Sequence, residues 1–168
     1  MSTLNITDAS LGLMRIKDPN EALGLAVRLL AGEAPFRDMP LGVSIGSLVG
    51  SIDAGNYIFA SRGDRAVGVT FWMFTQPEDA EAWLFRGKRL SEDALTKGGP
   101  AAIILGLKAT ETEVTRLLFR GLRDIYVEVD LCYFMRDYGK DDDRGRRAVR
   151  LVRPKVRRKP KDAAQVGG

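Results

Sequence analysis

Two segments near the start of the chain carry apolar residues at helical spacing. Asp18-Pro19-Asn20-Glu21 combines an N-cap aspartate, a proline at the first helical position and an acid three residues after the cap. The sequence therefore predicts a helix from Pro19, ended by Gly32, whose apolar face comprises Leu23, Ala26, Val27, Leu29 and Leu30. A second helix is predicted after Pro40, and Gly55 ends it.

Shorter apolar runs farther along the chain predict strands. Residues 57–60 and 66–72 flank Arg62-Gly63-Asp64-Arg65, which is typical of a hairpin turn. A helix led by Pro77, a buried strand over 101–107 and a helix capped by Thr110 follow, and further strands are predicted over 127–135 and 147–152. This order predicts an α+β fold with a mixed central sheet and helices packed on its faces.

Three glycines recur every four residues in the second predicted helix: Gly42, Gly46 and Gly50. On a helix they form a flat stripe that another element can approach closely. We expect close packing of this stripe on the sheet, and a surface for a second copy or another partner is the alternative.

Charge is distributed unevenly. Of the 26 lysine and arginine residues, ten lie between Arg144 and Lys161, a stretch without an acidic residue, so the rest of the chain is acidic overall. We therefore expect three parts: an N-terminal arm over residues 1–17, a domain over 18–153 and a basic flexible tail over 154–168. The candidate partner-binding residues at this end are Arg153, Lys155, Arg157, Arg158 and Lys159.

An acidic protein and an anionic surface both fit this basic tail. The tail lacks aromatic residues that would stack on bases, which disfavours nucleic acid. The sequence shows neither a secretory signal pattern nor an apolar run long enough for a membrane span, so we expect a cytoplasmic protein.

The sequence lacks the residues that several kinds of catalytic and binding site require. The chain has no histidine, which excludes a Ser-His-Asp or Cys-His centre, and no phosphate-binding glycine motif joins a strand to a helix. Cys132 is interpreted as a buried apolar residue, and Glu128 and Asp130 as the solvent face of a strand. We expect neither a metal nor a cofactor.

The segments Ala34–Pro40, the helix to Ile52, Gly55–Arg62 and Ala66–Trp72 together resemble the toxin-activating lysine acyltransferase family. The resemblance runs from about Leu23 to Pro154 and is most specific in the hairpin that ends at Trp72. It implies a GNAT-like fold. It also implies transfer of a fatty acyl group from acyl carrier protein to lysines of an RTX protoxin.

The chain departs from that family at both catalytic positions. The loop that holds the family's catalytic histidine reads Phe36-Arg37-Asp38-Met39 here, and the strand that holds its catalytic aspartate contains no carboxylate. By position in that loop, Arg37 and Asp38 are the candidate catalytic residues. The candidate substrate-binding residues are Trp72, Ile104 and Leu105.

Two hypotheses follow. In the first, the chain is an active acyltransferase that depends on positioning, with Asp38 as proton acceptor and the basic tail meeting an acidic carrier. In the second, the chain is a pseudoenzyme that keeps the acyltransferase scaffold and uses the same pocket to bind a lipid or to dock a partner, a second copy included.

Overall fold

The computed structural model describes residues 10–91, 98–125, 129–137 and 146–152, and the strands in this part of the chain form one sheet. The strands lie in the order β1-β2-β3-β4-β5-β6, and every neighbouring pair is antiparallel except β4 and β5, which are parallel. The bounds are β1 Leu11–Met14, α1 Pro19–Leu30, the 3-10 helix η1 Phe36–Asp38, α2 Leu41–Asp53, β2 Tyr57–Arg62, β3 Arg65–Thr75, α3 Pro77–Arg86, β4 Ala101–Ala109, α5 Thr112–Ile125, β5 Leu131–Asp137 and β6 Arg146–Val152.

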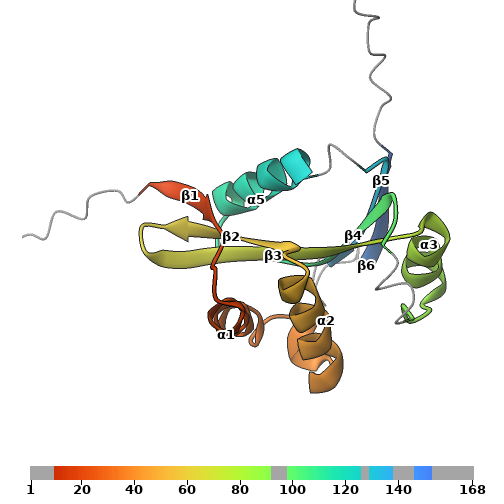
Figure 1. Ribbon diagram of the computed structural model, residues 1–168, viewed down its shortest axis with the longest axis horizontal. Coiled ribbons are helices and arrows are strands. Elements are labelled where there is room, and N and C mark those ends of the chain that lie inside the picture. The colour runs from red at the N-terminus through yellow and green to blue at the C-terminus, as the bar shows by residue number, and fades with distance from the viewer. Residues whose placement is uncertain (1–9, 92–97, 126–128, 138–145, 153–168) are drawn as a thin grey trace, which may run out of the picture.

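Helices cover both faces of the sheet (Figure 1). Helices α1 and α2 lie on one face, α5 lies on the other, and α3 packs at the end of the sheet near β5 and β6. The core accordingly has a cluster around Phe59 and Phe71 beneath α1 and α2, and a second around Trp72 beneath α5. A third cluster joins α3 to the sheet through Ile103 and Tyr133. This arrangement confirms the predicted α+β fold.

Local chemistry accounts for where the elements begin and turn. The Asp18 carboxylate accepts hydrogen bonds from the backbone N–H groups of Asn20 at 2.8 Å and Glu21 at 3.3 Å, as expected of an N-cap. Gly63 takes a positive φ of 61° in the turn between β2 and β3, which confirms the predicted hairpin. Gly55, with φ of 70°, ends α2 as predicted.

Some sequence predictions were wrong in detail. Residues 11–14, assigned to the N-terminal arm, form β1 and pair with β2. Four residues are too few for an alternating pattern to stand out, so this pairing was visible only in the fold. Helix α5 begins at Thr112, two residues beyond the predicted cap.

The glycine stripe of α2 does not pack on the sheet. A Cβ atom added to Gly42, Gly46 or Gly50 would meet no atom of the described residues within 4 Å. The expectation of close helix–sheet packing is therefore wrong, because α2 turns Ser44, Leu48 and Ile52 towards the core instead.

Several predicted residues lie outside the described part of the chain. They include Glu128 and all five candidate partner-binding residues, from Arg153 to Lys159. Within the described part, Cys132 is buried as expected, and Asp130 is exposed just before β5. No helix in the described segments is long and apolar enough to cross a membrane.

Candidate functional site

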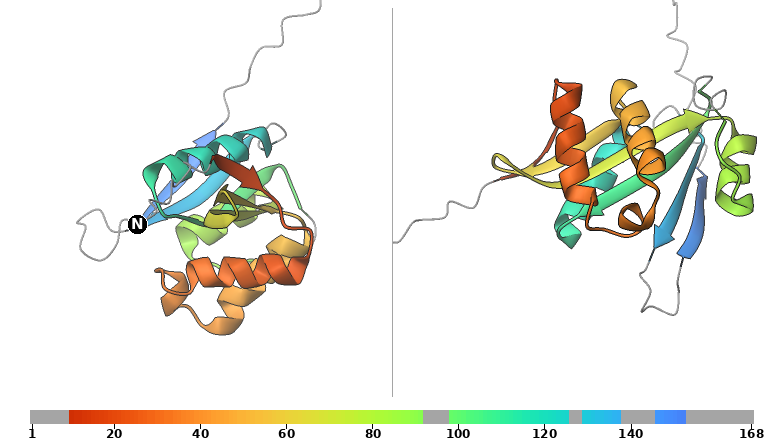
Figure 2. Two further views of the ribbon diagram at one scale, coloured as in Figure 1. Left: turned by 90° about the vertical axis from the view of Figure 1, so that its left-hand side faces the viewer. Right: turned by 90° about the horizontal axis from the view of Figure 1, so that it is seen from below.

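Strands β4 and β5 run together for only four residues and then part. Ala101 to Ile104 of β4 pair with Leu131 to Phe134 of β5, whereas β4 continues to Ala109. The right-hand view of Figure 2 shows the two strands diverging from this point. The part of β4 beyond Ile104 therefore has no β5 partner among the described residues.

A bulge in β4 coincides with this parting. Phe71 of β3 pairs with Gly106, and the next residue, Trp72, pairs with Ile104, so Leu105 is an extra residue without a β3 partner. Leu105 therefore lies at the point where the pairing of β4 with β3 and the pairing of β4 with β5 are both interrupted. Bulges of this kind redirect a backbone and its side chain, and they are frequent beside active sites.

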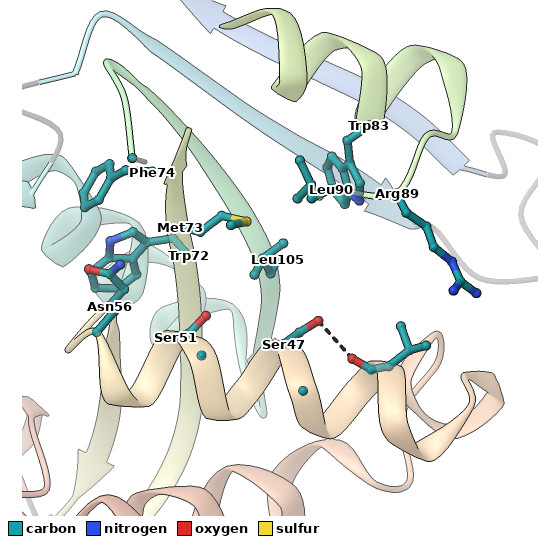
Figure 3. A pocket seen from close by; sticks show the side chains of 15 residues that line it. Ser47, Ser51, Asn56, Trp72, Met73, Phe74, Trp83, Arg89, Leu90 and Leu105 are labelled. Atoms are coloured by element: carbon teal, nitrogen blue, oxygen red, sulfur yellow. Dashed lines mark hydrogen bonds between the residues drawn. The ribbon is translucent and has the colours of Figure 1, made fainter. Parts of the chain in front are cut away.

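A pocket of about 530 Å³ opens beside the bulge, between α2, β3, β4 and the segment after α3. Its lining is mostly apolar, and Figure 3 shows Met73 and Leu105 on one side of β3, with Trp83 and Leu90 opposite α2. The lining residues are Val43, Gly46, Ser47, Gly50, Ser51, Ala54, Asn56, Trp72, Met73, Phe74, Trp83, Arg89, Leu90, Gly98 and Leu105.

Polar groups in this pocket are few. Arg89 is the one ionisable side chain among the described lining residues, and it is exposed. The Ser47 hydroxyl donates to the Val43 carbonyl of its own helix at 3.0 Å. The Trp72 indole Nε1 is buried and has no hydrogen-bond partner among the described residues, and Trp72 also packs in the cluster beneath α5. The pocket can enclose an apolar chain with little polar recognition.

The three candidate substrate-binding residues lie close together but face different sides. Trp72 and Leu105 line the pocket. Ile104 is 6% exposed and packs in the cluster beneath α5, to which Trp72 also belongs. Because Ile104 and Leu105 are neighbours on the bulged strand, their side chains point to opposite faces.

The candidate catalytic residues lie on η1, outside the pocket lining. Arg37 Nε lies 3.4 Å from Asp38 Oδ1, and both side chains are about half exposed. The ring of the preceding residue, Phe36, contacts Phe71 with ring centroids 5.6 Å apart. The loop therefore presents a phenylalanine, not a charged group, to the sheet.

Gly106 shows how closely this loop approaches the bulge. A Cβ atom there would lie 2.6 Å from Phe36 Cζ and 2.4 Å from Phe71 Cε1. Lys108 of β4 holds the start of the same loop, because its Nζ lies 2.6 Å from Glu33 Oε1. Only glycine fits at position 106, and the loop is fixed over β4 by both contacts.

The N-terminus of α5 lies at the end of β4 where the strands have parted. Helix N-termini attract anions, but this one carries Glu111 and Glu113. Arg62 Nη2 lies 3.2 Å from Glu111 Oε2 and 3.5 Å from Glu113 Oε2. Arg62 compensates one of the two carboxylate charges, and the remaining negative charge disfavours a diphosphate at this end of the site.

Tyr133 belongs to a polar cluster behind the pocket wall. Its hydroxyl lies 3.3 Å from Glu81 Oε1, which also accepts from Arg150 Nη1 at 3.0 Å. Burial and, after it, the charge of Glu81 raise the pKa of Tyr133. The cluster joins α3 to β5 and β6 and so holds the helix that carries Trp83.

Sequence reasoning missed most of the pocket. Trp83 and Leu90 are ordinary apolar residues in the sequence, and Ser47, Ser51 and Asn56 carry no motif. The one available signal was the glycine stripe, since Gly46 and Gly50 line the pocket. We interpreted this stripe as a surface that packs on the sheet, whereas the space beside it is open.

Solved structures with this fold were found, whereas no protein-family model and no curated protein matches the sequence. GphF, a GNAT-like decarboxylase in complex with isobutyryl-CoA, is 18% identical with a TM-score of 0.57, covering 78% of this chain and 67% of that chain. The loading GNATL domain of CurA from Lyngbya majuscula is 13% identical with a TM-score of 0.53, covering 76% of this chain and 65% of that one.

A mosquito arylalkylamine N-acetyltransferase, like 5b, is 15% identical with a TM-score of 0.50, covering 75% of this chain and 76% of that one. The chain thus spans about two thirds of the length of the GphF and CurA chains. At these identities the similarity concerns the fold alone. The chain has a GNAT-like fold, as the resemblance implied.

Proposed function

We propose that this chain is an acyltransferase that takes a fatty acyl group from acyl carrier protein and transfers it to a lysine of a protein acceptor, as toxin-activating acyltransferases do. One observation carries the proposal: β4 and β5 part at the Leu105 bulge, where an apolar pocket opens. A thioester lying between the parted strands would have its carbonyl at the bulge and its acyl chain in the pocket.

The pocket suits a hydrocarbon chain. Its volume of about 530 Å³ lies within the usual range for small-ligand sites. Each methylene moved from water into it would contribute about 0.8 kcal/mol. Met73, Leu105 and Leu90 supply apolar walls.

The charges at the end of the parted strands favour a carrier-bound donor. Coenzyme A would bring a diphosphate close to Glu111 and Glu113, whose two negative charges Arg62 compensates only in part. A phosphopantetheine arm on a carrier protein brings a single phosphodiester, which stays with the carrier surface. We therefore favour acyl carrier protein over free acyl-CoA as the donor.

In the proposed reaction, the neutral lysine amine attacks the thioester carbonyl carbon. A C–N bond forms, the C–S bond breaks, the pantetheine sulfur leaves as a thiolate, and the surplus amine proton passes to solvent or to a carboxylate such as Asp38. The backbone N–H of Leu105, the bulged residue without a β3 partner, would donate to the developing oxyanion. Positioning of the two reactants contributes several kcal/mol, and a general base adds about 10²–10⁴-fold.

Binding without transfer is the second candidate. The described lining residues include no carboxylate, imidazole or thiol, and Phe36 covers the bulge from the loop that carries Arg37 and Asp38. A protein with this site would hold an acyl chain or dock an acylated carrier and perform no chemistry.

Intact-mass analysis separates the two candidates. The protein is incubated with palmitoyl acyl carrier protein and a lysine-containing acceptor, with a sample lacking this protein as control. An acyl-sized mass gain on the acceptor that depends on the protein supports transfer. Retention of the acylated carrier by the protein without any mass gain on the acceptor over hours supports binding alone. If neither transfer nor retention is observed, both candidate functions are rejected.

A further inference from the structure

Three arginines form a row on the outer face of α5. Arg116, Arg120 and Arg123 are exposed, and their spacing of four and three residues places them on one side of the helix. The acidic residues of α5 are Glu113, one turn before Arg116 and paired with Arg62, and Asp124. The row is therefore a concentrated positive charge.

An exposed aromatic ring lies beside this row. Phe119 is 38% exposed, and its ring leans towards β5, where its centroid lies 6.3 Å from that of Phe134. The arginines at positions 116 and 123 are three and four residues away on the helix, so they flank the ring.

Strands β5 and β6 extend the surface on the same face of the sheet. Cys132 and Phe134 pack in the cluster beneath α5, so their β6 partners, Leu151 and Val149, lie on that face too. Leu151 is 52% exposed. The exposed Arg147, two residues before Val149 on β6, adds another positive charge to this face.

The surface borders the parted strands. Helix α5 follows β4 and runs back antiparallel to it, so Arg116 lies near the end of β4 that has separated from β5. Phe119 lies one turn farther along, beside Phe134, which is the last residue of β5 that pairs with β4. A partner seated here would face the opening through which a thioester arm enters.

We propose that this surface, comprising Arg116, Phe119, Arg120, Arg123, Arg147 and Leu151, is the docking site for an acidic helix of acyl carrier protein. The inference rests on the proposed function for the identity of its occupant. Arginines would pair with carboxylates of the carrier helix, and Phe119 would be the apolar anchor. Aromatic residues and arginine are the types enriched in protein interfaces. Such pairing mainly accelerates association.

A protein fits this surface better than a nucleic acid or a membrane. One exposed ring that already contacts Phe134 provides no series of platforms for stacked bases. A membrane-bound helix needs a broad apolar face, whereas the apolar face of α5 is occupied by the sheet, with Val114, Leu118 and Leu122 all fully buried.

The test compares variants of the full chain for binding of palmitoyl acyl carrier protein and, separately, of free palmitate. Arg116→Glu/Arg120→Glu reverses two exposed charges, and Arg28→Glu on α1 is the matched surface control. A tail variant tests how much the basic tail contributes to carrier binding. In it, five residues are changed to glutamine: Arg153, Lys155, Arg157, Arg158 and Lys159. Association rates are recorded at low and high salt.

We expect the double α5 variant to associate with the carrier about tenfold more slowly or worse at low salt, while it binds palmitate as the unmodified chain does and Arg28→Glu is unaffected. Carrier binding that survives in the α5 variant but is lost in the tail variant would overturn the proposal. The same variants are also titrated with an oligonucleotide and with anionic vesicles, and a loss of either binding in the α5 variant with unchanged carrier binding would likewise overturn the proposal. Failure of palmitate binding in every variant would instead reject the proposed function.

Discussion

Replacing Gly46 by leucine tests the acyl pocket most directly. Gly46 is the sixth residue of α2, it lines the pocket, and an added Cβ atom would meet nothing within 4 Å. Gly24 is the sixth residue of α1, has the same open surroundings and lies away from the pocket, so Gly24→Leu is the matched control.

The structure gives opposite expectations for stability and binding. Glycine in a helix interior costs about 0.7 kcal/mol relative to leucine, so each variant should gain about 2 °C in Tm for a chain of this length. The leucine at position 46 adds four carbon atoms to the pocket. If they displace four methylenes of a bound chain at about 0.8 kcal/mol each, palmitate binds about 200-fold more weakly.

The assays are thermal unfolding by circular dichroism and titration of palmitate by calorimetry. Gly46→Leu should unfold at a higher temperature and bind palmitate weakly, and Gly24→Leu should unfold at a higher temperature and bind normally. Normal palmitate binding by Gly46→Leu would refute the placement of the acyl chain. A lower Tm for Gly46→Leu would refute the conclusion that this face of α2 is open.

Three further predictions follow from named contacts. Gly106→Ala places a Cβ atom 2.4 Å from Phe71 Cε1, so urea unfolding should show a loss of about 1–3 kcal/mol, whereas Gly42→Ala should show none. The raised pKa of Tyr133 means that the folded protein resists ionisation of its phenol, so the free energy of unfolding should fall as pH rises above about 10. Tyr133→Phe should weaken that fall. If the free energy of unfolding depends equally on pH in the two proteins, the effect does not come from Tyr133. Asp38 is half exposed and is paired with its neighbour Arg37, so Asp38→Ala should leave stability within about 0.5 kcal/mol. If Asp38 accepts the amine proton, the same variant should slow acyl transfer about 10²–10⁴-fold in the mass assay, and unchanged transfer would exclude that role.

Local signals identified most of the elements before the structure did. The Asp18 cap, the Gly63 turn and the continuous apolar run from Ala101 act over a few residues, so the sequence predicted α1, the hairpin and β4. Strand β1 was missed because its four residues form a strand only by pairing with β2, whose paired residues lie 45 to 51 positions farther along the chain.

The candidate site depended on longer-range relations. Trp72 and Leu105 were expected to bind substrate, and both line the pocket, but Trp83 and Leu90 join them only because α3 packs at the far end of the sheet. The loop over 36–39 was expected to present Arg37 and Asp38. The fold turns Phe36 inward instead, because its ring fills the space above Gly106.

By itself the sequence determined the α+β class, the helix caps and turns, the absence of imidazole chemistry and the excess of positive charge near the C-terminus. These properties follow from residue type and short spacing, which need no knowledge of distant contacts. Only the tertiary structure decided that β4 bulges at Leu105 where it leaves β5, and that the glycines of α2 line a pocket. It also brought Phe119 of α5 beside Phe134 of β5. Each of these features depends on strand register and helix placement, which are set by the packing of residues far apart in the chain.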